Sequence, residues 1–280
     1  MKRFSFLMLA LLLCASTIFA QIQIDWWHSM TGKNAAALEE LVKRFNDSQT
    51  AYKVVPAFKG SYSDSMNAGI AAFRAKQPPH IIQVYEVGTA TMMNAGGAIY
   101  PVYKLMKDAG EKFDPKAYIH TITGYYSTSK GEMLSLPFNS STSVMYYNKD
   151  AFRKAGLDPE KPPVTWPEFF EVAKKLKASG MEGGFSTNWI SWIQLENFSA
   201  WHNQSFGTKN NGFDGLDATL VFNTPLTVKH FETIYELSKD KTFIYGGREN
   251  KANPLFTSGT VGLHFESIGG YGNFKNTCKF

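Results

Sequence analysis

Three tryptophans lie within a stretch of thirteen residues, at positions 189, 192 and 201. Trp189 and Trp192 are three residues apart, so their rings would share one face if the segment is helical. Paired indole rings can stack on the apolar CH face of glycerol or a sugar, which would make this segment a binding platform. Core packing is the alternative use of such rings, and the residue types alone favour it.

Hydroxyl, carboxyl and glycine positions add further candidates for ligand contact. Ser140–Ser143 carries four consecutive hydroxyl side chains. Glu86 follows a predicted strand, at the end where the binding residues of open α/β sheets project. Gly269–Gly272 could present backbone amides to an anion at the start of a helix. Taken alone, each position also fits an ordinary role, as a polar linker, a surface carboxylate or a turn.

Sequence motifs of the common catalytic and metal sites are absent. The chain has no Gly-x-x-x-x-Gly-Lys loop, no His-Glu-x-x-His pair and no Gly-x-Ser-x-Gly elbow. Asp214 and Asp217 suggest a calcium loop, but the glutamate that such a loop needs is missing, and an Asx turn is the better interpretation. The histidines show no metal-ligand spacing and are scattered: His28, His80, His120, His202, His230 and His264. We therefore predict no catalytic residue, no metal site and no cofactor.

An alternation of strands and helices must position the candidate residues. In the first helix, the apolar side chains at 38, 41, 42 and 45 are spaced to share one face. Strand, helix, strand, helix, strand in this order predicts a parallel sheet with helical crossovers. These five elements are predicted at Ile22–His28, Asn34–Asn46, Tyr52–Phe58, Ser61–Lys76 and Ile81–Tyr85.

The second half of the chain continues the α/β pattern. Thr165 and Glu168 form a predicted capping box. Thr224 is a predicted N-cap that is followed by Pro225 at the first helical position. Extended segments are predicted at Met133–Phe138, Val144–Asn148 and Val261–Phe265, and helices at Lys149–Ala155, from Thr165 to Ser179 and from Thr224 to about Lys239.

The element order predicts two α/β lobes with a ligand cleft between them. The chain would cross between the lobes near residues 139–143 and 261–267. Lobe 1 is predicted over 21–140, with a return at about 264–280, and lobe 2 over 141–263. Small ligands bind preferentially in clefts at domain interfaces.

The first twenty residues have the layout of a secretory signal peptide, with Lys2 and Arg3 before an apolar run and Ala20 at its end. The run is too short to span a bilayer, which takes about 20 apolar residues. A lipid anchor at Cys14 is less favoured because Leu13 precedes it. The only other cysteine is Cys278, so the secreted chain could form no intramolecular disulfide.

The charge of the chain gives no reason to expect a nucleic-acid partner. Of the formal charge of +5, two positive charges belong to Lys2 and Arg3, which leaves +3 without them. There is no run of Lys or Arg. A mild positive excess is compatible with an anionic small ligand but defines no site.

Several longer strings resemble the glycerol-3-phosphate-binding branch of the periplasmic solute-binding proteins of ABC importers. The similarity extends over the whole chain after residue 20. The strings are Trp27–Met30, Tyr52–Pro56, Gln83–Met93, Pro137–Thr142, Tyr146–Asp150, Trp192–Trp201 and Lys209–Gly215. The resemblance implies an α/β, two-lobed periplasmic-binding-protein fold of type II, like that of maltose-binding protein.

The resemblance also implies a set of ligand-binding residues. Glu86 would accept hydrogen bonds from the glycerol hydroxyls, and the stacking rings would cover the carbon face. The phosphate would lie near three hydroxyl donors, of which Ser267 has the weakest local match. The implied set is Tyr62, Glu86, Ser141, Trp189, Trp192 and Ser267.

The function implied is capture of sn-glycerol 3-phosphate in the periplasm and delivery to the membrane permease, by a monomer without covalent chemistry. Glycerophosphodiesters are further candidate ligands. The family also uses a glycine, a tyrosine and an arginine that would lie beyond Phe280, so the fold would be incomplete at its C-terminus. We therefore expect residues 21–280 to bind weakly or not at all. The alternatives are a sugar- or maltodextrin-binding protein of the same fold, a secreted hydrolase and an adhesion module.

Overall fold

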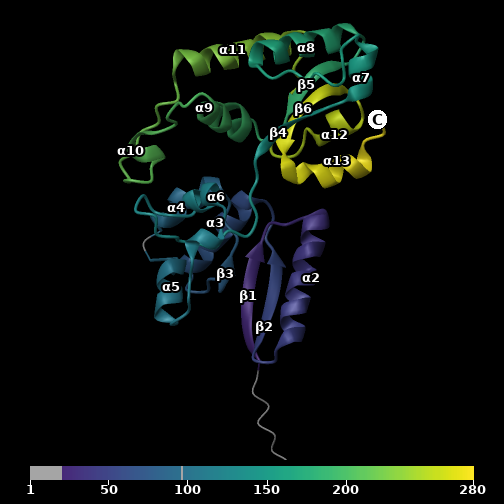
Figure 1. Cartoon of the computed structure of the whole chain (residues 1–280). Coiled ribbons are helices and arrows are strands. Elements are labelled where there is room, and N and C mark those ends of the chain that lie inside the picture. The colour runs from purple at the N-terminus through teal and green to yellow at the C-terminus, as the bar shows by residue number, and fades with distance from the viewer. Residues whose placement is uncertain (1–20, 96) are drawn as a thin grey trace, which may run out of the picture. The chain divides into compact units, whose positions relative to one another are not determined.

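A computed structural model describes residues 21–95 and 97–280 (Figure 1). The predicted signal peptide and Cys14 lie outside the described residues. By the density of internal contacts the chain divides into a first unit that ends at Tyr100 and a second unit that begins at Pro101. The lobe boundary at residue 140, predicted from the sequence, stays a prediction.

The first unit is built on a parallel sheet of three strands in the order β2-β1-β3. The predicted parallel sheet with helical crossovers is therefore confirmed. The third strand is shorter than predicted, since the chain leaves the sheet after Ile82 and forms a short 3₁₀ turn at Glu86–Gly88. The elements are β1 at Ile22–His28, α2 at Gly32–Ser48, β2 at Tyr52–Phe58, α3 at Tyr62–Arg74, β3 at Ile81–Ile82 and α4 at Thr89–Met93.

Helix α2 covers the sheet with a narrower apolar face than the sequence predicts. Leu38 and Val42 are buried and pack with Met30 and with Val54 of β2. The other two predicted members of this face, at 41 and 45, are nearly half exposed. A sheet of three strands offers a narrow surface, which the innermost two side chains of the helix already cover.

The second unit contains a mixed sheet in the order β4-β6-β5. Strand β4 (Ser143–Tyr147) runs antiparallel to the central strand β6 (Val261–Ser267), and β5 (Gly183–Thr187) runs parallel to it. The segment predicted as extended at Met133–Phe138 is not a strand of this sheet, and within it only Met133 forms a β-bridge, to Ser127. Pro137 has no N–H to donate to a ladder.

Helices pack against this sheet, and the predicted capping signals are confirmed. Thr165 and Glu168 make the reciprocal bonds of a capping box at the start of α8. Thr224 accepts a hydrogen bond from the N–H of Thr227 and caps α11. The helices of the second unit are α5 Val102–Asp108, α6 His120–Tyr125, α7 Lys149–Lys154, α8 Trp166–Ala178, α9 Phe198–Trp201, α10 Thr208–Asn211, α11 Pro225–Lys239, α12 Asn253–Thr257 and α13 Tyr271–Thr277.

The core of the second unit is rich in phenylalanine. Phe185 of β5 is fully buried, and its ring lies 4.9 Å from the rings of both Phe169 and Phe243. Phe265 of β6 lies 5.0 Å from Phe169. Edge-to-face and tilted ring pairs of this kind add about 0.5–1.5 kcal/mol each to the burial of their area. The sheet that carries the candidate residues therefore rests on a tightly packed layer of rings.

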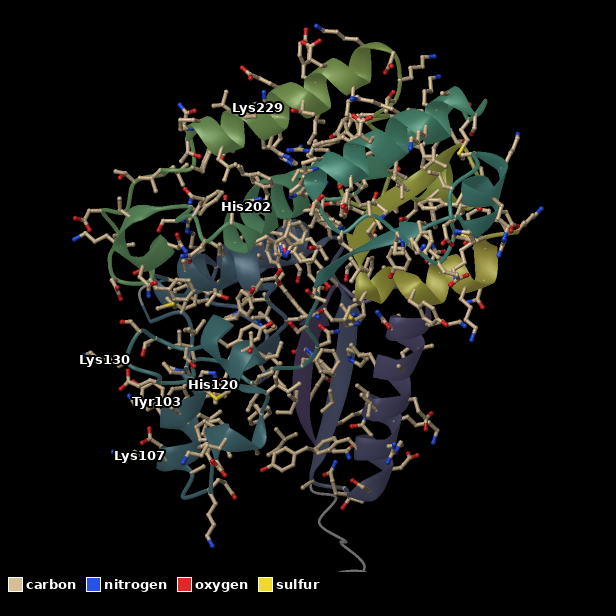
Figure 2. All side chains as sticks on the ribbon, turned by 45° about the horizontal axis from the view of Figure 1, so that its top comes forward. Tyr103, Lys107, His120, Lys130, His202 and Lys229 are labelled. Atoms are coloured by element: carbon tan, nitrogen blue, oxygen red, sulfur yellow. The ribbon has the colours of Figure 1, made fainter. Side chains whose placement is uncertain are left out.

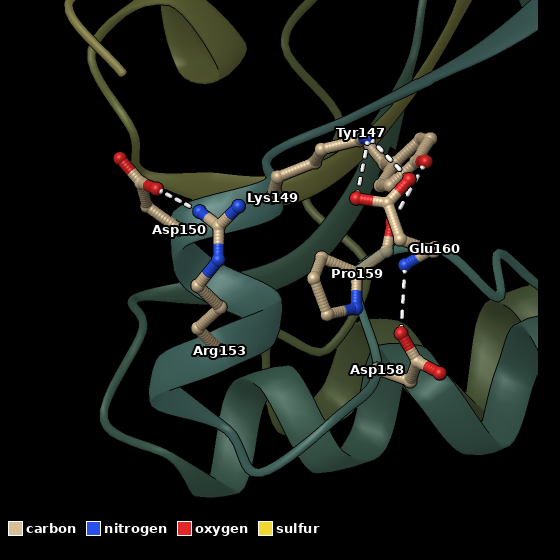
Figure 3. Close-up of polar contacts among 7 residues, drawn as sticks. All are labelled: Tyr147, Lys149, Asp150, Arg153, Asp158, Pro159 and Glu160. Atoms are coloured by element: carbon tan, nitrogen blue, oxygen red, sulfur yellow. Dashed lines mark hydrogen bonds and ion pairs between the residues drawn. The ribbon is translucent and has the colours of Figure 1, made fainter.

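The connection between α7 and α8 is held against the end of β4 by polar contacts (Figure 3). Lys149 lies 2.8 Å from a carboxylate oxygen of Glu160. The hydroxyl of Tyr147 donates to the carbonyl of Pro159 at 3.0 Å. Exposed ion pairs contribute little stability, so these contacts mainly fix the path by which the chain enters α8.

Close packing between α8 and β5 depends on a glycine. A Cβ at Gly184 would lie 2.2 Å from the carbonyl oxygen of Ala173 in α8. We expect Gly184→Ala to push the helix off the sheet and to lower the free energy of unfolding by about 1–3 kcal/mol. Urea denaturation checks this. The matched control is Gly124→Ala in α6, where a Cβ meets nothing within 4 Å. A loss at Gly124 as large as that at Gly184 would contradict the clash.

Candidate functional site

Two of the predicted residues in the first unit follow strands that end at the same edge of the parallel sheet. Tyr62 opens α3 after β2, and Glu86 opens the 3₁₀ turn after β3. Since β2 and β3 both run parallel to β1, their carboxyl ends share one edge. This edge is where open α/β sheets bind ligands.

The electrostatics of this edge link Tyr62 to Glu86. The ring of Tyr62 stacks on that of Tyr85, with centroids 5.3 Å apart and planes at 7°. Burial raises the pKa of the Tyr62 phenol, and the negative charge of Glu86 raises it further. The phenol therefore keeps its proton at neutral pH and can donate a hydrogen bond, while the carboxylate nearby can accept one.

Hydrogen bonds join the loops that leave the three strands. The N–H of Ser29 donates to Gln83 Oε1 at 3.0 Å, and its hydroxyl donates to the carbonyl of Ser61 at 3.2 Å. Lys59 follows β2 and holds its ammonium 4.1 Å from the ring centroid of Trp27. Sequence reasoning missed this cation, although its place directly after a predicted strand was a usable signal.

Three predicted residues of the second unit also meet at one edge of a sheet. Because β4 is antiparallel and β5 parallel to β6, the start of β4 lies beside the ends of the other two strands. Ser141 lies two residues before β4, Ser267 ends β6, and Trp189 lies two residues after β5. The N–H of Ile268 donates to the carbonyl of Thr142 at 3.0 Å, which holds the two serine segments side by side.

The backbone around the two tryptophans has unusual conformations. Trp189 has φ of 43°, in the left-handed region that side chains rarely adopt. Trp189 precedes the first helical residue, so it does not share a helical face with Trp192, as it would if the whole segment were helical. Trp192–Asn197 is wound as a π-helix. Left-handed residues and π-turns both cost energy and concentrate at functional sites.

Trp189 is held through its ring and Trp192 through its backbone carbonyl. The Nε1–H of Trp189 donates to Asn250 Oδ1 at 2.6 Å, and both tryptophans are half-buried against the phenylalanine core. The side chain of Asn197 donates to the carbonyl of Trp192 at 2.7 Å and accepts from the hydroxyl of Ser143 at 3.1 Å. Trp201 is half exposed and packs near Trp166 at the other end of the segment.

The side chain of Ser267 caps the turn that follows β6. Its oxygen accepts the N–H of Gly269 at 3.0 Å, which leaves the hydroxyl hydrogen to donate elsewhere. That contact uses one of the backbone amides that the predicted anion site at Gly269–Gly272 would need. Ser141 is exposed, so its hydroxyl is accessible to a ligand.

In the described part of the chain, no group of three or more His, Cys, Asp or Glu residues could hold a metal ion. His120 begins α6 and His202 follows α9, on separate elements (Figure 2). His230 and His264 are buried in the second unit. Over the same described residues, no helix is both long and apolar enough to cross a membrane.

The two sheets and their helices define a solute-binding fold like that of maltose-binding protein. The chain aligns over 92% of its length with UgpB from Mycobacterium tuberculosis in complex with glycerophosphocholine, at 22% identity and a TM-score of 0.76, and covers 63% of that chain. It aligns over 93% with the GacH receptor of Streptomyces glaucescens, which was solved unliganded and with acarbose, at 15% identity and a TM-score of 0.75, and covers 64% of it.

Residues 31–277 match the family model of the bacterial extracellular solute-binding proteins, and the chain belongs to this family. The resemblance to solute-binding proteins that the sequence strings indicate is thereby confirmed. The chain is 54% identical over 259 residues to the sn-glycerol-3-phosphate-binding periplasmic protein UgpB of Brucella abortus (strain 2308), a match that takes 92% of the chain and 60% of that protein. It is 52% identical over 258 residues to the protein of the same name from Escherichia coli K12, over 92% of the chain and 59% of the relative. The chain thus spans about 60% of the length of these curated relatives.

Proposed function

We propose that this protein is the substrate-binding component of an ABC importer, that it works in the periplasm, and that it captures sn-glycerol 3-phosphate. The observation that carries the proposal is the identity of 52–54% to relatives that are named for binding this ligand. The fold alone would suit a sugar equally well, as the likeness to the GacH receptor illustrates.

In this proposal the first unit recognises both ends of the ligand. The carboxylate of Glu86 accepts hydrogen bonds from the glycerol hydroxyls, and the phenol of Tyr62 donates to the phosphate. The effect of the Glu86 charge on the pKa of Tyr62 supports their acting side by side. An anion at Glu86 repels a phosphate, so the two ends of glycerol 3-phosphate would bind in one orientation.

The second unit is proposed to contribute hydroxyl donors and ring faces. Ser141 and Ser267 donate to the phosphate, and the rings of Trp189 and Trp192 cover the carbon face. The support is that three of these residues follow or precede strands that meet at one edge of the sheet. We further propose that the liganded protein, a monomer, is the form that the membrane permease recognises and that the ligand is not chemically altered.

Saturation-transfer NMR tests the choice of ligand because it also detects weak binding. We expect transfer from the protein to glycerol 3-phosphate and to glycerophosphocholine, and none to maltose. Transfer to maltose alone would favour the sugar-binding alternative and reject the proposal. Phosphorus NMR of glycerophosphocholine over hours would reveal turnover, which is the mark of the hydrolase alternative.

A tryptophan substitution tests the proposed stacking. In a protein extended to the full length of its relatives, Trp189→Ala should weaken binding of glycerol 3-phosphate about tenfold, which corresponds to about 1.4 kcal/mol. Titration of the parent and the variant gives the ratio of dissociation constants. Trp201→Ala is the control, since this half-exposed ring packs near Trp166, is not among the predicted ligand contacts and should leave the constant unchanged. Equal affinities of Trp189→Ala and the parent would remove the ring from the site.

A further inference from the structure

A buried acid lies directly behind the candidate residues of the second unit. Glu266 of β6 is only 3% exposed. One carboxylate oxygen accepts the side-chain amide of Asn188, and the other accepts the N–H of Ser267 at 2.6 Å. Burial raises the pKa of Glu266, and these two donors oppose that effect. Burying a carboxylate costs free energy that an apolar side chain of the same size would not, so packing alone does not explain the residue.

The side chain of Asn188 is the centre of this polar network. Asn188 is fully buried, and its Oδ1 accepts the N–H of Ala252 at 3.0 Å. This contact fixes the orientation of the amide. Its Nδ2 therefore points to the carboxylate of Glu266 and to Asn253 Oδ1, which lies 2.6 Å away.

The network continues directly to Trp189, the next residue in the chain. The N–H of Trp189 donates to the carbonyl of Glu249 at 3.2 Å, and its ring N–H donates to Asn250. Asn188 holds the far end of the same segment, at Ala252 and Asn253. The segment from Glu249 to Asn253 is thus bound at one end by Trp189 and at the other by Asn188, the partner of Glu266.

We propose that Glu266 is a positioning residue, which through Asn188 holds Trp189, and through its own bond holds the backbone of Ser267, in the geometry that the ligand requires. The link to ligand binding rests on the function proposed above. Glu266 itself does not touch the ligand in this proposal. Its carboxylate couples two contact residues that stand on neighbouring strand ends.

A pair of complementary substitutions tests the coupling. In Glu266→Gln, one acceptor becomes an NH₂ group. This group faces either the amide of Asn188, which cannot turn without losing Ala252, or the N–H of Ser267, so two donors face each other in both orientations of the new side chain. In the double variant Asn188→Asp with Glu266→Gln, the carboxylate introduced at position 188 accepts from the new amide and from the N–H of Ala252, and Asn253 can turn to donate. The net charge of the pair is unchanged, and complementarity is restored.

The readout is the indole N–H signal of Trp189 in the ¹⁵N-labelled, ligand-free protein, assigned by its loss in Trp189→Phe. We expect a shifted or broadened signal in Glu266→Gln and a return toward the parent position in the double variant. Binding of glycerol 3-phosphate should weaken at least tenfold in the single variant and recover at least partly in the double. Should Glu266→Gln not fold, Asn253→Ala removes a neighbouring partner of Asn188 and is expected to move the same signal.

Ser186→Ala is the matched control, because it removes another buried hydrogen bond of the same sheet, to His264 at 2.8 Å. It should lower the melting temperature without moving the Trp189 signal. An unmoved Trp189 signal in Glu266→Gln, or an equal movement in Ser186→Ala, would overturn the positioning role. The signal needs no ligand, so a parent protein that binds neither glycerol 3-phosphate nor glycerophosphocholine would defeat the proposed function while this test still gives its answer.

Discussion

Phe185→Ala should lower the free energy of unfolding by about 3–5 kcal/mol, as large-to-small changes at fully buried phenylalanines do. Phe185 is fully buried and is in ring contact with Phe169 of α8 and with Phe243. The substitution would leave a cavity between β5 and α8. Natural proteins are stable by only about 5–15 kcal/mol, so a loss of this size removes much of the margin.

Urea unfolding followed by hydrogen-exchange mass spectrometry checks this prediction, because it reports each unit separately. The loss should appear in the second unit and leave β1 and β2 protected. Tyr235→Ala on α11 is the matched control. This ring is 63% exposed, and its removal should change stability by no more than about 0.5 kcal/mol. A small change at Phe185, comparable to that of the control, would show that the core tolerates the cavity.

Stability of the second unit should fall steeply as the pH drops below about 6.5. Burial lowers the pKa of His264 to about 3, and burial with a nearby histidine, His202, lowers that of His230 to about 4. Both are neutral in the folded state, and their contribution is complete above the unfolded value of 6.5. It is lost as the pH falls toward the folded values, because only the unfolded chain takes up protons. Each histidine contributes a slope of up to about 1.4 kcal/mol per pH unit.

The group with the opposite sign is Glu266. Because its pKa is raised in the folded state, its ionisation at rising pH lowers the stability of the fold. This residue alone would make the protein more stable at lower pH. Two histidines outweigh one carboxyl group over this range. The net slope between pH 6 and 4.5 should therefore remain positive.

Urea titrations at a series of pH values measure the slope, and substitutions assign it. His230→Gln can keep the hydrogen bond to Gln194, which His230 Nε2 makes at 3.0 Å, and should remove the share of one histidine. His120→Gln at an exposed position of the same unit is the control and should keep the parent slope. Identical slopes in all three proteins would mean that burial of His230 has no part in acid sensitivity.

The elements that could be predicted are those with strong local signals. Alternation of strands and helices gave β1, α2, β2 and α3 to within a few residues. Side chains that satisfy backbone groups at helix ends, such as Thr165 and Thr224, marked the starts of α8 and α11. In these places the chemistry of a few adjacent residues decides the conformation.

Structure set by distant partners could not be predicted in this way. Strand β5 begins Gly183-Gly184, which local propensity disfavours in strands. A Cβ at Gly183 would clash with Ile244, and one at Gly184 with the backbone of α8, so small residues are needed there. Trp189, which is in the left-handed region, donates to Glu249 and Asn250, and Asn188 donates to Glu266. These contacts join residues far apart in sequence. The candidate binding residues were predicted from the family resemblance. Their placement at the ends of strands follows from the order and direction of the strands in each sheet.

The π-helix after Trp189 lets the chain hold one residue more than an α-helix would between Trp189 and α9. Each residue of an α-helix advances the chain by about 100° around the axis, and the π-turn accommodates one residue more than an α-turn would. Deleting a single residue from 192–197 would let the segment rewind as a regular helix continuous with α9. The segment would still be helical, and the residues on its two sides would keep nearly the same mutual orientation, because five α-helical steps turn the chain by about as much as six π-helical steps. An alignment gap in this stretch would therefore be compatible with the same fold on both sides of it.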